Sequence, residues 1–117
     1  MVRIAFATED EKGLDSRIST RFGRAPTITV VEVDERSGEV KSVKVIRNPG
    51  AEAASGAGVK AAEAVANAGA TVYAGPNPGP NAYLALQHFG IKVITVTGTT
   101  VREALPKVLE ELKSGGS

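Results

Sequence analysis

Two arginines flank a phenylalanine and a glycine in the sequence Arg21-Phe22-Gly23-Arg24. Guanidinium groups match the geometry of carboxylates and phosphates, so this segment could hold an anion around an apolar anchor. We therefore predict that Arg21, Phe22, Gly23 and Arg24 bind a ligand. The alternative interpretation is that Phe22 belongs to the core and that both arginines are solvated.

Three further glycine-rich segments could offer backbone N–H groups to the same anion. They cover residues 55–58, 75–81 and 97–100, and each precedes an expected helix. The N-terminus of a helix is the positive end of its dipole and carries N–H groups without intrahelical acceptors. In any one loop taken alone, the favoured interpretation is that glycine and proline only make the turn. Because several such loops are expected on one face, we predict that the ligand also contacts Gly56, Gly58, Gly75, Gly79, Asn81, Gly98, Thr99 and Thr100.

The segment Gly56–Ala61 fits a dinucleotide-binding fingerprint only superficially. Several residues separate it from the preceding strand, and no acidic residue follows at the distance that a ribose hydroxyl requires. It is not a Walker loop either, because no serine or threonine follows Lys60 to reach magnesium. These residues therefore do not predict a nucleotide site.

No group of side chains predicts catalysis. Glu9, Asp10, Glu11 and Asp15 are best interpreted as solvated turn charges, although carboxylates of this kind also occur in two-metal sites that handle phosphoryl groups. The single histidine, His88, has no cysteine or second histidine beside which to bind a metal. No serine motif of a nucleophile is present. We therefore predict a protein that is not an enzyme.

The pattern of apolar residues and turn residues predicts how these loops are positioned. The expected strands cover residues 2–8, 27–34, 39–47, 71–74 and 91–96. The expected helices run from residue 56 or 58 to 68, from 80 to 89, and from Thr100 onward past Pro106. The apolar face of the first helix is predicted to consist of Val59, Ala62, Val65 and Ala66. This order indicates a three-layer α/β/α fold with a mixed five-stranded sheet.

Composition limits the class of protein. A chain of 117 residues is close to the usual length of one domain, so we expect a single domain over 1–117 with an ordered core at about 2–113. The net charge of +1 argues against nucleic acid as a partner. The absence of cysteine fits a reducing compartment, and no segment resembles a signal peptide or a membrane span, so we expect a cytoplasmic protein.

The motifs occur in a characteristic order. Arg21–Pro26 is followed by Gly56-Ala57-Gly58 with Ala61-Ala62, then by Gly79–Ala82 and Gly90–Val93. From Ile4 to about Leu109, this ordered set resembles the dinitrogenase iron-molybdenum cofactor biosynthesis family, of the NifX, NifY and NifB C-terminal type. The resemblance implies a ribonuclease H-like motif, a sheet order of 3-2-1-4-5 and an antiparallel second strand.

The resemblance also implies a function. Family members bind or carry iron-sulfur precursors of the nitrogenase cofactor and are not themselves catalysts, so a small anionic or metal-cluster ligand and cofactor-assembly partners are expected. The family often has histidine where this chain has Arg21, and another near the glycine-rich helix start, where residues 55–60 contain none. We therefore expect an anion to be held by Arg21, Arg24 and the helix N-termini, in place of iron ligation by imidazole. A phosphoryl-handling enzyme and a protein-interaction module using the edge strand at 39–47 remain alternatives.

Overall fold

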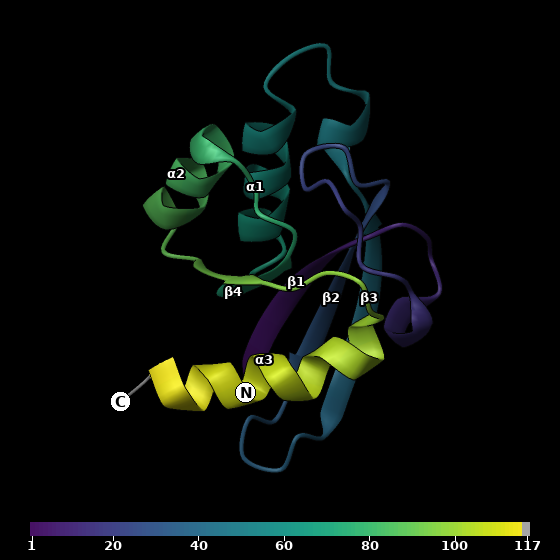
Figure 1. Ribbon diagram of the computed structural model, residues 1–117, viewed down its shortest axis with the longest axis vertical. Helices are drawn as coiled ribbons and strands as arrows, with labels where there is room; N and C mark the ends of the chain where they lie inside the picture. The colour runs from purple at the N-terminus through teal and green to yellow at the C-terminus, as the bar shows by residue number, and fades with distance from the viewer. Residues whose placement is uncertain (116–117) are drawn as a thin grey trace.

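Five strands form one mixed sheet in the computed structural model, which describes residues 1–115 (Figure 1). The sheet order is β3-β2-β1-β4-β5. β1, β4 and β5 are parallel, whereas β2 runs antiparallel to both β1 and β3. The order and directions predicted for the sheet are therefore confirmed. The strands are β1 Val2–Thr8, β2 Thr27–Val33, β3 Val40–Arg47, β4 Val72–Gly75 and β5 Lys92–Thr95.

β1 forms the centre of the sheet because its side chains are apolar on both faces. Ala5 and Ala7 point into one core, and Ile4 and Phe6 point into the other. This alternation is the period of two that a strand imposes on its side chains. A strand buried on both faces reads as a nearly continuous apolar run, which is why its position could be predicted from the sequence.

Helices cover both faces of the sheet and complete three layers. α1 (Ala57–Asn67) and α2 (Pro80–His88) lie together on one face, and α3 (Val101–Gly115) lies on the other (Figure 1). The core under α1 and α2 includes Ala61, Val65, Tyr73 and Leu86, and the core under α3 includes Phe6, Val31, Val101, Ala104 and Val108.

The prediction that Val59 lies in the apolar face of α1 is wrong. Val59 is 40% exposed, while Ala61, Ala62 and Val65 are buried. The helix packs so closely through its alanines and Gly58 that its buried face is rotated away from Val59. Small side chains therefore set the orientation of α1, and the hydrophobicity of valine does not.

α3 continues through Pro106, which lies inside the helix. Proline lacks the N–H group that would bond the carbonyl of Arg102, one turn earlier. Both residues are exposed, so water can satisfy that carbonyl. α3 therefore continues past Pro106, although proline commonly ends a helix.

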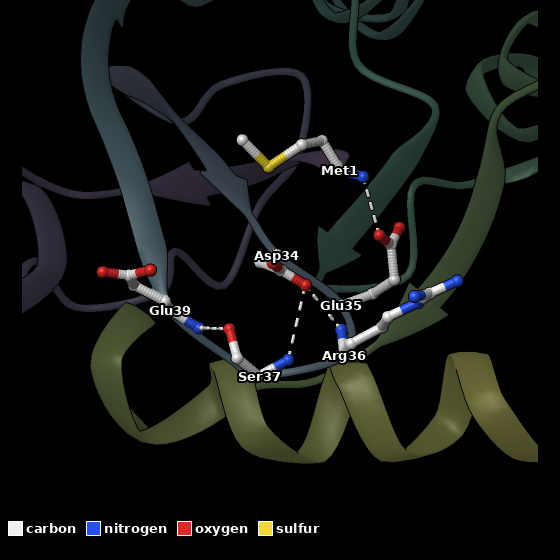
Figure 2. A network of polar contacts seen from close by, with 6 residues as sticks. All are labelled: Met1, Asp34, Glu35, Arg36, Ser37 and Glu39. Carbon is white, nitrogen blue, oxygen red and sulfur yellow. Dashed lines mark hydrogen bonds and ion pairs between the residues drawn. The ribbon is translucent and has the colours of Figure 1, made fainter.

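The β2–β3 hairpin closes at residues 34–39 through side chains of the turn itself (Figure 2). A carboxylate oxygen of Asp34 accepts hydrogen bonds from the backbone N–H groups of Arg36, at 2.9 Å, and Ser37, at 3.4 Å. The ammonium group of Met1 lies 2.6 Å from a carboxylate oxygen of Glu35. This contact fixes the start of β1 against the hairpin, at the end of the sheet remote from the predicted ligand-binding loops.

Candidate ligand-binding site

The carboxyl ends of β1, β4 and β5 lie on one edge of the sheet because these strands are parallel. The segments that follow them cover residues 9–26, 76–79 and 96–100. In open α/β sheets this edge is where ligands bind. The segment after β1 also contacts the segment after β5, because the N–H of Ile18 donates to the carbonyl of Thr99 at 3.0 Å.

The first turns of α1 and α2 are in direct contact at this edge. A Cβ atom on Gly58 would lie 2.9 Å from the Cβ of Ala82, so the two helices approach more closely than any larger residue at position 58 would permit. Gly56 and Gly79 are the N-caps, with φ angles of 67° and 85°, and a Cβ on either would meet nothing within 4 Å. Two glycine caps thus leave the space in front of both helices open.

Neither helix N-terminus is satisfied by a side chain. No side chain caps α1 or α2, and neither helix has an acidic residue in its first turn. The first-turn N–H groups of both helices therefore have no side-chain acceptor from their own turn. They lie at an edge where the helix dipoles are positive and no carboxylate of the same turn neutralises them. An anion placed there would meet two helix ends at once.

Gly23 packs against the first turn of α1. A Cβ on Gly23 would lie 2.9 Å from the nitrogen of Gly58 and 3.1 Å from the carbonyl carbon of Ala57. A Cβ on Gly50 would collide with the carbonyl oxygens of Ala57 and Gly23. Three backbone segments therefore meet without side chains between them, and the structure brings Gly23 and Gly58 together as packing residues.

Arg24 points to the loop before α1. Its guanidinium donates to the carbonyl oxygens of Ala53, Ala51 and Gly50 at 2.8, 3.2 and 3.5 Å. In return, the side-chain amide of Asn48 donates to the carbonyls of the loop that carries Arg24, at Phe22 and Gly23. Arg24 thus holds the short 3-10 turn Pro49–Glu52 in place.

Arg21 differs from Arg24 in having no partner for its guanidinium. Its side chain is exposed and takes part in no hydrogen bond or ion pair among the described residues. Only its backbone is fixed, by bonds with the hydroxyl of Ser19 at 3.0 and 3.1 Å. Arg21 therefore carries a guanidinium without an internal partner, two residues before the glycine that touches α1.

Phe22 is buried and makes an edge contact with Tyr73, with ring centroids 4.6 Å apart. The hydroxyl of Tyr73 donates to the carbonyl of Pro76 at 2.7 Å, and burial raises the pKa of this phenol. A Cβ on Gly75 would lie 2.6 Å from the same hydroxyl oxygen. The Phe22 ring and Gly75 therefore anchor two predicted ligand loops to one buried tyrosine.

In the loop 96–100, which follows β5, the threonine hydroxyls are bonded to a nearby carboxylate. The hydroxyls of Thr99 and Thr100 donate to one oxygen of Glu103 at 3.0 and 3.3 Å, and the N–H of Glu103 donates to the Thr100 hydroxyl at 3.3 Å. These bonds hold the pKa of Glu103 below its ordinary value, with the Thr99 hydroxyl as the main cause. Gly98 takes a φ of 74° and faces open space. The first turn of α3 thus contains the negative charge that α1 and α2 lack.

The acidic residues after β1 build a turn. Asp10 accepts hydrogen bonds from the Ser16 hydroxyl at 2.6 Å and the N–H of Lys12 at 3.1 Å, which lower its pKa, chiefly through Ser16. Between residues 1 and 115, no group of three or more His, Cys, Asp and Glu side chains is arranged to hold a metal ion.

A sequence model of the family described as "Dinitrogenase iron-molybdenum cofactor" matches residues 1–111. The chain belongs to this family. No curated protein sequence matches it. Within the described residues, no helix is long and apolar enough to cross a membrane.

Solved structures share the fold of this dinitrogenase iron-molybdenum cofactor family protein. The apo form of the orange protein from Desulfovibrio gigas is 37% identical, with a TM-score of 0.81, and the match covers 95% of this chain and 89% of that one. A NifB-like protein from Thermotoga is 31% identical, with a TM-score of 0.69 and coverages of 99% and 90%. The protein PH0822, at 23% identity, a TM-score of 0.77 and coverages of 94% and 92%, supports the fold.

This chain has a hollow of about 380 Å³ beside the start of α2. Its walls include Asn77, Tyr83 and Thr95, none of which the sequence analysis predicted as a site residue. Asn77 accepts a hydrogen bond from the N–H of Gly79 at 3.0 Å, which shapes the α2 N-cap. The asparagine two residues before a glycine is the sequence signal that could have indicated this role.

Proposed function

We propose that this protein is a non-enzymatic carrier of a small anionic ligand, of the class of iron-sulfur or iron-molybdenum cofactor precursors. The ligand would lie at the carboxyl edge of the sheet, in front of α1 and α2. Family membership supplies the class of ligand. The observation that carries the proposal is the contact between the first turns of two helices that have neither a side-chain cap nor an acidic residue.

The donors at this edge would hold an anion through hydrogen bonds and charge. First-turn backbone N–H groups of α1 and α2, including that of the exposed residue Asn81, would approach it directly, and the unpaired guanidinium of Arg21 would add a bidentate donor. Arg24 would act indirectly, because its guanidinium is bonded to the loop before α1. Of the predicted residues, the glycines at 56 and 79 would permit close approach of the ligand.

The nature of the donors restricts the cluster that could be carried. The chain contains no cysteine, and its one histidine is His88, at the far end of α2 from the proposed site. Iron-sulfur clusters assembled on proteins usually require thiolate ligands. The proposed cargo is therefore a cluster that arrives with its own sulfur ligands and carries a negative charge as a whole.

The proposal can be tested by anaerobic incubation of the protein with a preformed iron-sulfur cluster that carries small thiolate ligands, followed by gel filtration, metal analysis and absorbance spectroscopy. We expect iron and sulfide to co-elute with the protein in a defined ratio. The same experiment with Arg21→Ala should give less bound metal, whereas the control Arg36→Ala, at the opposite end of the sheet, should not.

A parallel titration with inorganic phosphate separates the two parts of the proposal. Phosphate bound at the α1 and α2 N-termini, with no metal retained, would contradict a cluster as cargo while supporting an anion site. Retention of neither metal nor phosphate would contradict the carrier function itself.

A further inference from the structure

A groove runs along the free edge of the sheet, away from the proposed ligand site. Its volume is about 460 Å³, and it lies between β3 and α1. Ile46, Ala64 and Ala68 contribute its apolar lining, and they also pack against the core under α1 and α2. β3 is the last strand on this side, so its outer backbone groups have no neighbouring strand within the described chain.

Basic side chains border this groove. Lys44 of β3 and Lys60 of α1 are exposed, and neither forms an ion pair among the described residues. Glu63 is the single acidic residue of the lining. β3 itself contains three basic residues and no acidic one. The free strand edge and the groove beside it therefore share an excess of positive charge.

We propose that β3 and this groove bind an extended acidic segment of a partner protein, which adds to the sheet as a sixth strand. From Ser42 to Arg47 the strand follows a regular register, and these residues present about 20 Å of edge. Backbone hydrogen bonds would supply affinity, as in other cases of strand addition. Alternate side chains of the partner would enter the groove, where their carboxylates meet Lys44 and Lys60.

The other face of the added strand would also find an apolar contact. Val43 points away from the groove, since alternate residues of a strand face opposite sides, and it is 38% exposed. A partner segment in which acidic and apolar residues alternate would therefore match both faces of β3.

The charge pattern distinguishes this partner from a second copy of the same chain. Pairing two β3 strands would bring Lys41, Lys44 and Arg47 of one copy close to those of the other. Edge lysines commonly prevent such self-association. The same lysines attract an acidic strand, so the edge is selective for acidic partners. This interaction is separate from the proposed ligand site and does not depend on the proposed carrier function.

The direct test uses a synthetic peptide of about ten residues with alternating glutamate and valine, sized to the strand edge. Binding to the full chain is measured by fluorescence anisotropy. A peptide with lysine in place of glutamate is the control that tests whether binding requires negative charge. We expect saturable binding of the acidic peptide alone. The variant Lys44→Glu/Lys60→Glu should weaken it by about tenfold, because two attractive pairs become repulsive.

A matched control keeps the same change in net charge. Lys92→Glu/Lys107→Glu alters two exposed lysines elsewhere, on β5 and α3, and should leave the affinity within about twofold. If both double variants weaken binding equally, attraction by net charge alone explains the result and the proposal is overturned.

Backbone pairing is tested with two N-methylated peptides of identical charge. Methylation of the amides that face β3 should abolish binding, whereas methylation of the alternate amides should not. Hydrogen exchange at residues 42–47 should slow when the unmodified peptide binds. Equal binding of both methylated peptides, absence of binding by the acidic peptide, or dimerisation through β3 in sedimentation analysis would each overturn the proposal.

Discussion

Gly58 and Ala82 join α1 to α2 at their first turns: a Cβ atom on Gly58 would lie 2.9 Å from the Cβ of Ala82. The Cβ of alanine is fixed to its backbone, so neither partner could move aside without moving a helix. This contact aligns two uncapped helix N-termini at the carboxyl edge of the sheet. It therefore links the packing of the fold to the proposed anion site.

We expect Gly58→Ala to lower the free energy of unfolding by about 1–2 kcal/mol, because overpacking outweighs the gain in helix propensity. Urea unfolding measures the change. The double variant Gly58→Ala/Ala82→Gly should be more stable than the sum of the two single changes predicts, because the second substitution restores the space. Additive effects, or stabilisation by Gly58→Ala alone, would contradict this contact.

Substitution of Arg24 should affect the stability of the fold, whereas substitution of Arg21 should affect anion binding. Arg24→Ala removes a charged donor to three backbone carbonyls and should lower the free energy of unfolding by about 1–3 kcal/mol. Arg21→Ala should change stability by less than about 0.5 kcal/mol and still weaken anion binding, because its guanidinium has no internal partner. Urea unfolding and phosphate titration of both variants provide the comparison. The reverse assignment of effects would contradict the roles given to these arginines.

Glu103 should titrate below its ordinary value in the folded protein, because the Thr99 and Thr100 hydroxyls donate to its carboxylate. A lowered pKa in the folded state stabilises the protein above the unfolded value of about 4.5, and this stabilisation is lost as the pH falls further. NMR titration of the Glu103 carboxyl carbon measures the midpoint. Thr99→Val should raise it, whereas Thr71→Val, at an exposed position on another loop, should not. A midpoint unaffected by Thr99→Val would show that the hydroxyl does not hold the charge.

Asp10→Asn should leave anion binding unchanged, because the Asp10 carboxylate is bonded to Lys12 and Ser16 within its own turn. The Ser16 hydroxyl keeps the pKa of Asp10 below 3.8, so its contribution to stability is present above that pH and is lost as the pH falls. The variant should therefore lose less stability than the natural protein on acidification, measured by urea unfolding at several pH values. Metal-dependent phosphate hydrolysis that disappears in this variant would instead support the phosphoryl-handling alternative.

The strands and helices could be predicted because their apolar patterns and glycine stops are local properties of the sequence. The left-handed glycines Gly38, Gly69 and Gly90 mark the ends of elements where the sequence predicts them. The orientation of α1 could not be obtained in this way. Periodicity favours Val59 as a core residue, yet contacts of Gly58 and the neighbouring alanines decide which face is buried.

The candidate site could be predicted only in part. The sequence places Arg21 and Arg24 on either side of Phe22, but only the structure distinguishes the free guanidinium from the one bonded to residues 50–53. The reciprocal role of Asn48 depends on contacts between residues 25 or more positions apart. Such long-range pairing leaves no periodic signal in a single sequence. The predicted role of Gly98–Thr100 in binding stays a prediction, with the threonine hydroxyls bonded to Glu103.

The central claim is that an anion binds in front of α1 and α2, and backbone amide chemical shifts test it most directly. The protein is titrated anaerobically with the preformed thiolate-ligated iron-sulfur cluster and, separately, with phosphate. The account predicts the largest shifts at the first-turn N–H groups of α1 and α2, including that of Asn81, and smaller shifts in Arg21→Ala. Saturable shifts confined to other regions, such as the Lys44 and Lys60 groove, would contradict it.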